Sequence, residues 1–150
     1  MKMGYDAKTK SAVLLALLLL SITIISCDTD TPLAEYRPSS DQEVAIKNVL
    51  LGFEDGVNRR DVKKVAGLIH EDANLMLGRE RRPISKPDYL KILPQRLADQ
   101  PPIALGRPKM ALSGNEADVR IYMKRGEARV LVTFHLSRVD HRWTINGWDY

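Results

Sequence analysis

The chain has 150 residues, of which 44% are hydrophobic and 28% charged, with a formal net charge of +4 and a single cysteine. One cysteine excludes an intrachain disulfide, and so small a net charge, part of it in the first ten residues, is not typical of a nucleic-acid-binding protein. The part beyond residue 40 is long enough for one domain with its own core and too short for two.

The first 26 residues have the organisation of an export signal. Residues 1–10 carry three lysines against one aspartate, and residues 12–25 follow as an uncharged apolar run. That run has the length of a signal-peptide hydrophobic region and falls short of the ~20 residues that span a bilayer. We therefore interpret residues 1–26 as a signal peptide. An uncleaved membrane anchor, extended by its flanks, is the alternative.

The sequence at the end of this run explains the lone cysteine. Ile24, Ile25, Ser26 and Cys27 resemble the lipobox of bacterial lipoproteins, with an aliphatic residue three before the cysteine and a small residue directly before it. The resemblance implies that Cys27 is lipidated and becomes the first residue of the mature chain. Several acyl chains hold a protein on a membrane, because each buried methylene contributes ~0.8 kcal/mol. We expect a lipid anchor in the cell membrane, with the domain on the periplasmic or extracytoplasmic side; a free or buried thiol is the alternative.

Residues 27–40 join this anchor to the domain. They are rich in Pro, Ser, Thr and Asp and have no sustained apolar period, so we expect the lipidated cysteine to be followed by a flexible tether. Asp28 resembles the inner-membrane retention signal of enteric lipoproteins. That signal is not general among bacteria, so the sequence leaves both inner and outer membranes open.

Residues 41–150 form the predicted domain, which begins with helices. A Ser-x-x-Glu capping box starts at Ser40 and precedes apolar residues at helical spacing, which predicts a helix. Asp61 is expected to cap a second helix, and Ser85 a third. Because proline lacks a backbone N–H, Pro94 should kink or divide the third helix.

From Ala104 onward the apolar period changes to two, which predicts an antiparallel meander of strands. Turns are expected at residues 113–115, 125–126 and 140–141. The positions expected to face inward and line the interior are Val119, Ile121, Val130, Val132, Phe134, Trp143 and Ile145. Helices first and strands last predict an α+β domain.

Two stretches carry a family resemblance. GVNRRDVKKVAGLIHEDANLML, residues 56–77, contains an Asn-Arg-x-Asp turn and an Asp-Ala entry into a short strand, and VDHRWTINGW, residues 139–148, has a late tryptophan followed by an aliphatic residue. Both resemble the SnoaL-like branch of the nuclear transport factor 2-like superfamily, over residues 41–150. The resemblance implies a curved antiparallel sheet wrapped by N-terminal helices, a cone-shaped, cystatin-like roll. It further implies an interior that can hold a small molecule and an outer sheet face that can support a dimer.

Enzymes of that superfamily place Asp, His or Tyr inside the cone, whereas the inward positions assigned here are aliphatic or aromatic. Acid–base catalysis needs an ionisable group within reach of the substrate, so we expect no catalytic residue. The remaining candidates for a group at the cone mouth are Asp72, Tyr89 and Asp149, the last in phase with the inward residues of the final strand. His70 and its two acidic neighbours point in different directions at a helix end, so neither a metal site nor a cofactor is expected.

The opposite sheet face mixes apolar and charged side chains. The residues of this face that are expected to form an interface are Tyr122, Leu131, His135 and Trp148. They alternate with arginines, and aromatic residues and Arg are enriched in protein interfaces. We therefore expect a homodimer or an envelope protein partner on this face.

Three functions follow from these patterns. We expect foremost a membrane-anchored, non-catalytic module that binds an apolar small molecule or a protein. A lipid-anchored enzyme of the isomerase or dehydratase type is the first alternative and needs an ionisable residue in the cone. A structural component of an envelope complex is the second, and a sealed, filled cone would favour it. No nucleic-acid partner is expected.

Overall fold

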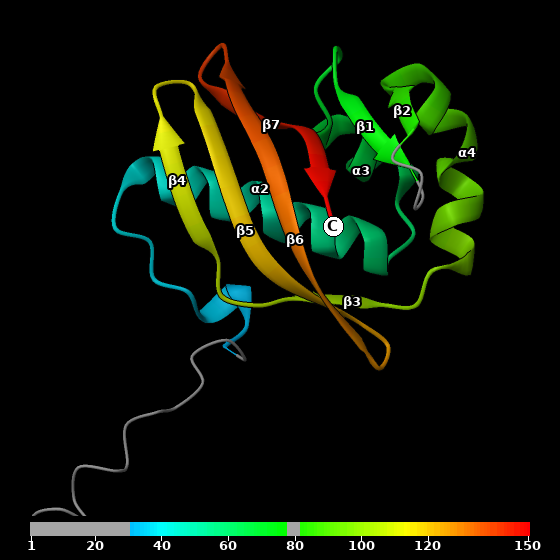
Figure 1. Ribbon diagram of the computed structural model, residues 1–150, viewed down its shortest axis with the longest axis horizontal. Helices are drawn as coiled ribbons and strands as arrows, with labels where there is room; N and C mark the ends of the chain where they lie inside the picture. The colour runs from blue at the N-terminus through cyan, green and yellow to red at the C-terminus, as the bar shows by residue number, and fades with distance from the viewer. Residues whose placement is uncertain (1–30, 78–81) are drawn as a thin grey trace, which may run out of the picture.

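The computed structural model describes residues 31–77 and 82–150; the predicted signal peptide, Cys27 and the start of the predicted tether lie outside this range. The described chain is α+β, as the sequence predicts (Figure 1). Its elements are η1 (Leu33–Glu35), α2 (Asp41–Asn58), α3 (Val62–Leu68), β1 (Asn74–Leu77), β2 (Arg82–Ser85), α4 (Lys86–Asp99), β3 (Ile103–Leu105), β4 (Lys109–Ser113), β5 (Glu116–Arg125), β6 (Ala128–Val139) and β7 (Arg142–Asp149). None of the helices in this range is both long and apolar enough to cross a membrane.

The three predicted helices begin where their capping residues indicate. The side chains of Ser40, Asp61 and Ser85 each accept a hydrogen bond from a backbone N–H in the following turn, at 3.2, 2.9 and 3.4 Å. These bonds satisfy donors that a helix start leaves unpaired. Of the two outcomes predicted for Pro94, a kink or a division, the division does not occur, because α4 runs through Pro94 as one helix. Burial of the leucines on either side of the proline compensates for the one helical hydrogen bond that proline removes.

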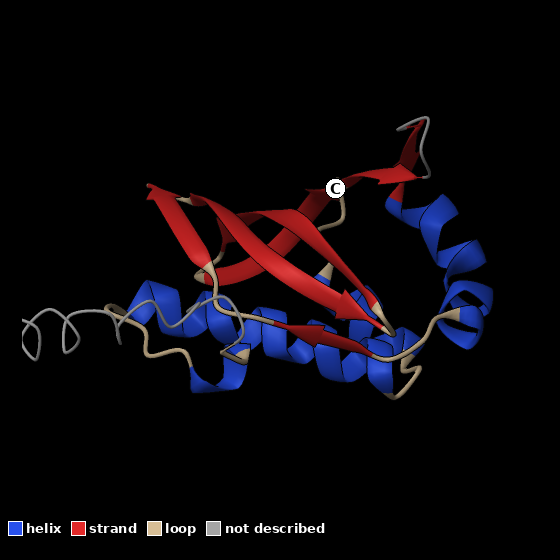
Figure 2. Ribbon diagram, turned by 60° about the horizontal axis from the view of Figure 1, so that its bottom comes forward, coloured by secondary structure: helices blue, strands red, loops and turns tan. Residues whose placement is uncertain are grey.

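The main sheet is antiparallel and strongly curved (Figures 1 and 2). β5 and β6 pair along their length, β7 continues the sheet beside β6, and β3 and β4 both pair with the other edge of β5. The predicted turns lie between β4 and β5, β5 and β6, and β6 and β7. β1 and β2 form a separate hairpin that packs beside β7. The sequence pattern did not predict β2.

α2 covers the concave side of the sheet, and α4 closes one end of the space between them (Figure 2). The apolar stripe of α2 faces the sheet through Ile46, Leu50, Phe53 and Val57, all buried. α2 also supplies polar groups to the short edge strand β3. The Asn58 side chain donates to the Ile103 carbonyl at 2.9 Å and accepts from the Ile103 N–H at 2.7 Å. The helix thus takes the place of a neighbouring strand at an otherwise open sheet edge.

One irregularity interrupts β7. The strand pairs regularly with β6 from Arg142 to Ile145, then carries Asn146 as an extra residue, and resumes with Gly147 opposite His135. This is a β-bulge, which shifts the alternation of side chains beyond it by one position. Gly147 also lets the hairpin approach closely, since a Cβ there would lie 3.0 Å from the Asn74 backbone oxygen. The bulge therefore sits where β1 meets the main sheet.

The bulge reverses the predicted orientation of two residues. Trp148 pairs with Phe134, faces inward and is 5% exposed, so its predicted place on the outer face is wrong. Asp149 pairs with Thr133 and lies on the outer face, so its predicted inward orientation is also wrong. Strict alternation fails for both because it assumes a strand without an inserted residue.

Part of the segment predicted as a flexible tether, residues 33–36, packs against the domain. Leu33 is fully buried in η1, against α2. The Lys47 ammonium donates to the carbonyls of Ala34 and Tyr36 at 2.8 and 2.7 Å, and the Tyr36 hydroxyl donates to Glu43 at 2.9 Å. These contacts offset the entropy of ordering the segment. The predicted tether therefore ends before Leu33 rather than at the start of α2.

Leu33→Ala should lower the free energy of unfolding by ~2–5 kcal/mol, because it leaves a cavity under η1. Val44→Ala is the control, since Val44 is 44% exposed on α2, and it should change that free energy by no more than ~0.5 kcal/mol. Urea denaturation followed by circular dichroism measures both. Equal unfolding free energies for wild type and Leu33→Ala would show that η1 is not part of the cooperative domain.

Candidate functional site

The inner side of the sheet is a packed core. Of the residues predicted to line the cone, Val119, Ile121, Val132, Phe134, Trp143 and Ile145 are buried and Val130 is half-buried. The space left between α2, α4 and the sheet is about 20 Å³. A single water molecule occupies roughly this much room. The interior as it stands therefore encloses no organic molecule.

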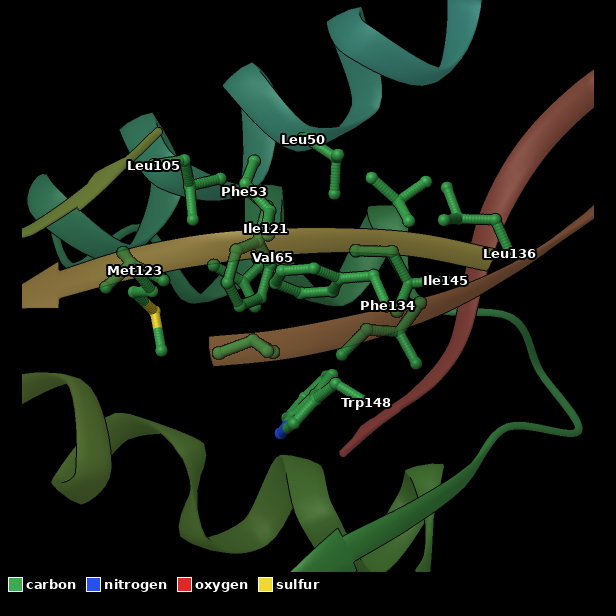
Figure 3. Packing of buried hydrophobic residues seen from close by; sticks show 14 of the residues in the cluster. Leu50, Phe53, Val65, Leu105, Ile121, Met123, Phe134, Leu136, Ile145 and Trp148 are labelled. Atoms are coloured by element: carbon green, nitrogen blue, oxygen red, sulfur yellow. The ribbon is translucent and has the colours of Figure 1, made fainter. Parts of the chain in front are cut away.

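Four aromatic rings fill the interior, and they come from four different elements: Phe53, Tyr89, Phe134 and Trp148. Neighbouring ring centroids lie 5.4 to 6.3 Å apart in tilted or edge-to-face arrangements, the favourable geometry for aromatic pairs. Figure 3 shows Trp148 beneath Phe134, on the side of the sheet that faces α4. The bulge in β7 thus provides the ring that closes the cone.

The small pocket opens to the surface through a polar rim. Arg96 and Gln100 of α4, Arg125 of β5 and Tyr150 line it together with Tyr89. We call Tyr89, Arg96, Arg125 and Tyr150 the cationic rim. Arg125 was missed by sequence reasoning, although it continues the inward phase of β5 by two residues beyond buried Met123. The alternation of inward and outward side chains along β5 is enough to place Arg125 on the inner face.

Tyr89, one of the three candidates predicted at the cone mouth, does lie there. It is 5% exposed, and burial raises its pKa to about 12, although the nearby Arg96 and Arg125 lower it. At neutral pH its hydroxyl keeps the proton, so it can donate a hydrogen bond but cannot serve as a general base.

The other two candidates, Asp72 and Asp149, lie on the opposite side of the sheet. They line a groove of about 530 Å³ together with His70 and His135. At this groove the His70 backbone N–H donates to the Ile145 carbonyl at 2.9 Å, which ties the end of α3 to β7. No local sequence signal connects these residues, since only packing brings the two ends of the domain together.

Two carboxylates hold His135 in this groove. Its Nδ1 lies 2.7 Å from Asp118 Oδ1, and its Nε2 lies 3.1 Å from Asp149 Oδ2. Burial lowers the pKa of His135, but the hydrogen bonds and charges of the two aspartates outweigh it, and the net shift is upward. In the imidazolium form both ring nitrogens donate, which leaves neither to accept a proton from a substrate. In this form His135 and the two aspartates make an ion-pair network.

The side chains of the three polar residues that follow α3 do not converge on one point; these residues are His70, Glu71 and Asp72. The Asp72 backbone N–H donates to His70 Nδ1 at 3.1 Å, while Glu71 forms an ion pair with Lys86 Nζ at 2.6 Å. Within residues 31–77 and 82–150, no three His, Cys, Asp or Glu side chains are placed to hold a metal ion.

No protein-family model and no curated protein matches this chain. Solved structures share its fold at low identity. A protein of unknown function with a cystatin-like fold from Nostoc punctiforme has a TM-score of 0.64 and 13% identity over 75% of this chain and 92% of that one. A proposed calcium/calmodulin-dependent protein kinase II association domain from Xanthomonas campestris has a TM-score of 0.64 and 15% identity, over 81% of this chain and 92% of that one. A proposed dehydratase of the nuclear transport factor 2-like family from Streptomyces avermitilis has a TM-score of 0.59 and 15% identity, over 72% of this chain and 94% of that one.

These similarities establish the fold and nothing finer, because each identity is far below the level at which function is shared. The described domain has the cone-shaped, cystatin-like fold of nuclear transport factor 2-like proteins, as the sequence resemblance implied.

The raised pKa of His135 predicts a pH-dependent contribution to stability. The contribution is complete below the unfolded-state pKa of about 6.5 and is lost as pH rises through the higher folded-state pKa. The difference in unfolding free energy between wild type and His135→Gln should therefore be largest near pH 6 and shrink by about pH 9. His141→Asn, in the β6–β7 turn, is the control. Denaturation at a series of pH values measures this, and a difference independent of pH would contradict the network.

Proposed function

We propose that this chain is a lipid-anchored, non-catalytic interaction module on the extracytoplasmic side of a bacterial cell membrane. The packed cone carries the proposal, since the pocket among the described residues of α2, α4 and the sheet has a volume of about 20 Å³. Catalysis in the cone needs room for a substrate beside an acid or base, and ligand pockets are usually ~300–1,000 Å³. The described interior is therefore unsuited to the isomerase or dehydratase alternative. Partners contact the surface of the domain instead.

The anchor is proposed from the lipobox at Cys27, and the position of Leu33 adds a consequence. Five residues separate Cys27 from Leu33, which is fully buried in the domain. An extended chain spans at most ~3.3–3.6 Å per residue, so this link reaches roughly 20 Å. The domain is held close to the lipid surface, which confines its partners to the same membrane zone.

Replacing Cys27→Ser should leave an unlipidated precursor that keeps its signal peptide, because the serine hydroxyl does not replace the thiol in diacylglyceryl transfer. The wild type should fractionate with membranes and carry lipid in its intact mass. Ser26→Ala keeps a small residue before the cysteine and should behave as wild type. A mature wild-type chain whose mass includes no lipid would defeat the proposed anchor.

The partner surface we propose is the outer face of the main sheet. Tyr122 and Leu131 are cross-strand neighbours on β5 and β6 and are 37% and 42% exposed. The Arg129 guanidinium lies 4.2 Å from the centre of the Tyr122 ring. Exposed aromatic and aliphatic side chains beside an arginine are typical of the centre of a protein interface.

The charges of this face are separated along the strands. Lys124 and Arg129 are paired at one end of the β5–β6 ladder, whereas Glu116 and Asp118 lie toward the other end. When two such faces oppose each other about a two-fold axis that lies in the plane between them and runs perpendicular to the strands, the basic end of one copy lies over the acidic end of the other. We therefore propose a second copy of this chain as the partner, with an envelope protein as the competing outcome.

The chain without residues 1–27 should sediment as a dimer at high micromolar concentration. Leu131→Glu places a charge at the centre of the proposed contact and should weaken self-association at least about tenfold. Ile92→Glu, at a 37% exposed position on α4, is the matched control and should leave it unchanged. The proposal is contradicted if two results are found together. The wild type would be a monomer, and Leu131→Glu would change neither the solubility of the chain nor its recovery with envelope proteins.

A further inference from the structure

The cationic rim concentrates hydrogen-bond donors around one small opening. Arg96 from α4 and Arg125 from β5 both act electrostatically on the Tyr89 hydroxyl, as does Tyr150, so the four side chains lie close together. No Asp or Glu side chain is among the described residues that line this pocket. Two guanidinium groups repel each other in a partly buried site, and a negative charge between them relieves that repulsion.

Among the described residues of the cationic rim, Arg125 has a side-chain nitrogen that lacks a hydrogen-bond acceptor. Its Nε is buried and has no hydrogen-bond partner in the described structure. One terminal nitrogen donates to the Tyr150 hydroxyl, but over a long 3.4 Å. A buried donor without an acceptor is costly, and more so on a charged group. The edge formed by Nε and a terminal nitrogen matches the spacing of two oxygens of a carboxylate or phosphate.

The surroundings of Arg125 favour an anion over a neutral acceptor. Burial raises the pKa of Tyr89 to about 12, so its hydroxyl stays protonated: its oxygen accepts from Arg96, and its proton remains available to donate to an anion. Beneath the rim, Trp148 packs edge to face against Tyr89, so the floor of the pocket is aromatic. Charge-assisted hydrogen bonds are stronger beside such an apolar floor than in open water.

We propose that the cationic rim binds a small oxyanion, either the carboxylate of an organic acid or a phosphate group. Arg125 donates to it through Nε and a terminal nitrogen, Arg96 supplies the second positive charge, and Tyr89 donates its hydroxyl proton. The rest of the ligand stays outside the cone, because the rings below the rim leave about 20 Å³. The rim lies across the sheet from the outer face, so this binding depends on neither the lipid anchor nor self-association.

Calorimetric titration of the full chain in a non-ionic detergent tests the proposal, with acetate, inorganic phosphate and acetamide as probes and empty micelles as the blank. Acetamide has the size and shape of acetate without its charge. Acetate or phosphate should bind with one site per chain, and acetamide at least about tenfold more weakly than the better anion. The tighter of the two anions identifies the source of the oxyanion. Equal binding of acetate, phosphate and acetamide, or no binding of either anion, would overturn the proposal.

Variants then locate the site. Arg125→Gln removes both the charge and Nε, whereas Arg125→Lys keeps the charge and loses the planar fork, so both should weaken anion binding, Gln by at least about tenfold and Lys by less. Arg142→Gln, exposed at the start of β7, is the matched control and should change affinity less than twofold. If Arg125→Gln does not fold by circular dichroism, the Lys variant carries the test. Unchanged affinity in the folded Arg125 variants, or an equal loss in Arg142→Gln, would contradict binding at the rim.

Discussion

One extra residue in β7, Asn146, determines which side chains occupy each side of the sheet. The bulge it creates turns Trp148 inward, where it closes the cone, and turns Asp149 outward, where it reaches His135 Nε2 at 3.1 Å. In a regular strand the same alternation would place the carboxylate of Asp149 in the cone and the indole outside. The bulge therefore places the Trp148 ring in the cone instead of the Asp149 carboxylate. It also gives His135, on the outer face, a second carboxylate partner beside Asp118.

This exchange explains why the fold alone does not assign a function. Structures with the same architecture include a proposed dehydratase and a proposed kinase association domain, so a shared fold does not give a shared role. In this chain the aromatic filling leaves the inner side only a charged opening, bounded by Arg96 and Arg125, while the outer side offers an apolar centre between oppositely charged ends. The two surfaces are separated by the sheet, so each can bind independently of the other.

Much of the fold was predictable because its signals are local. Ser40, Asp61 and Ser85 cap their helices through hydrogen bonds to residues three positions away, and the β-turns follow from short polar or glycine-containing segments. Alternation along β5 and β6 identified the inner face correctly, because the pairing of these two strands is regular along its whole length. Carried two residues further, it would also have placed Arg125 at the cone mouth.

The sequence by itself determined where the three helices begin, where the turns between the last strands lie and which faces of α2, β5 and β6 are apolar, since these depend on neighbours in the chain. Only the tertiary structure decided the inward turn of Trp148, the docking of Leu33 and the meeting of Tyr89 with Arg125. A bulge is a property of two paired strands, so one strand's alternation does not reveal it. Docking of a terminal segment and convergence of distant side chains depend on which surfaces pack together, and local sequence does not encode that choice.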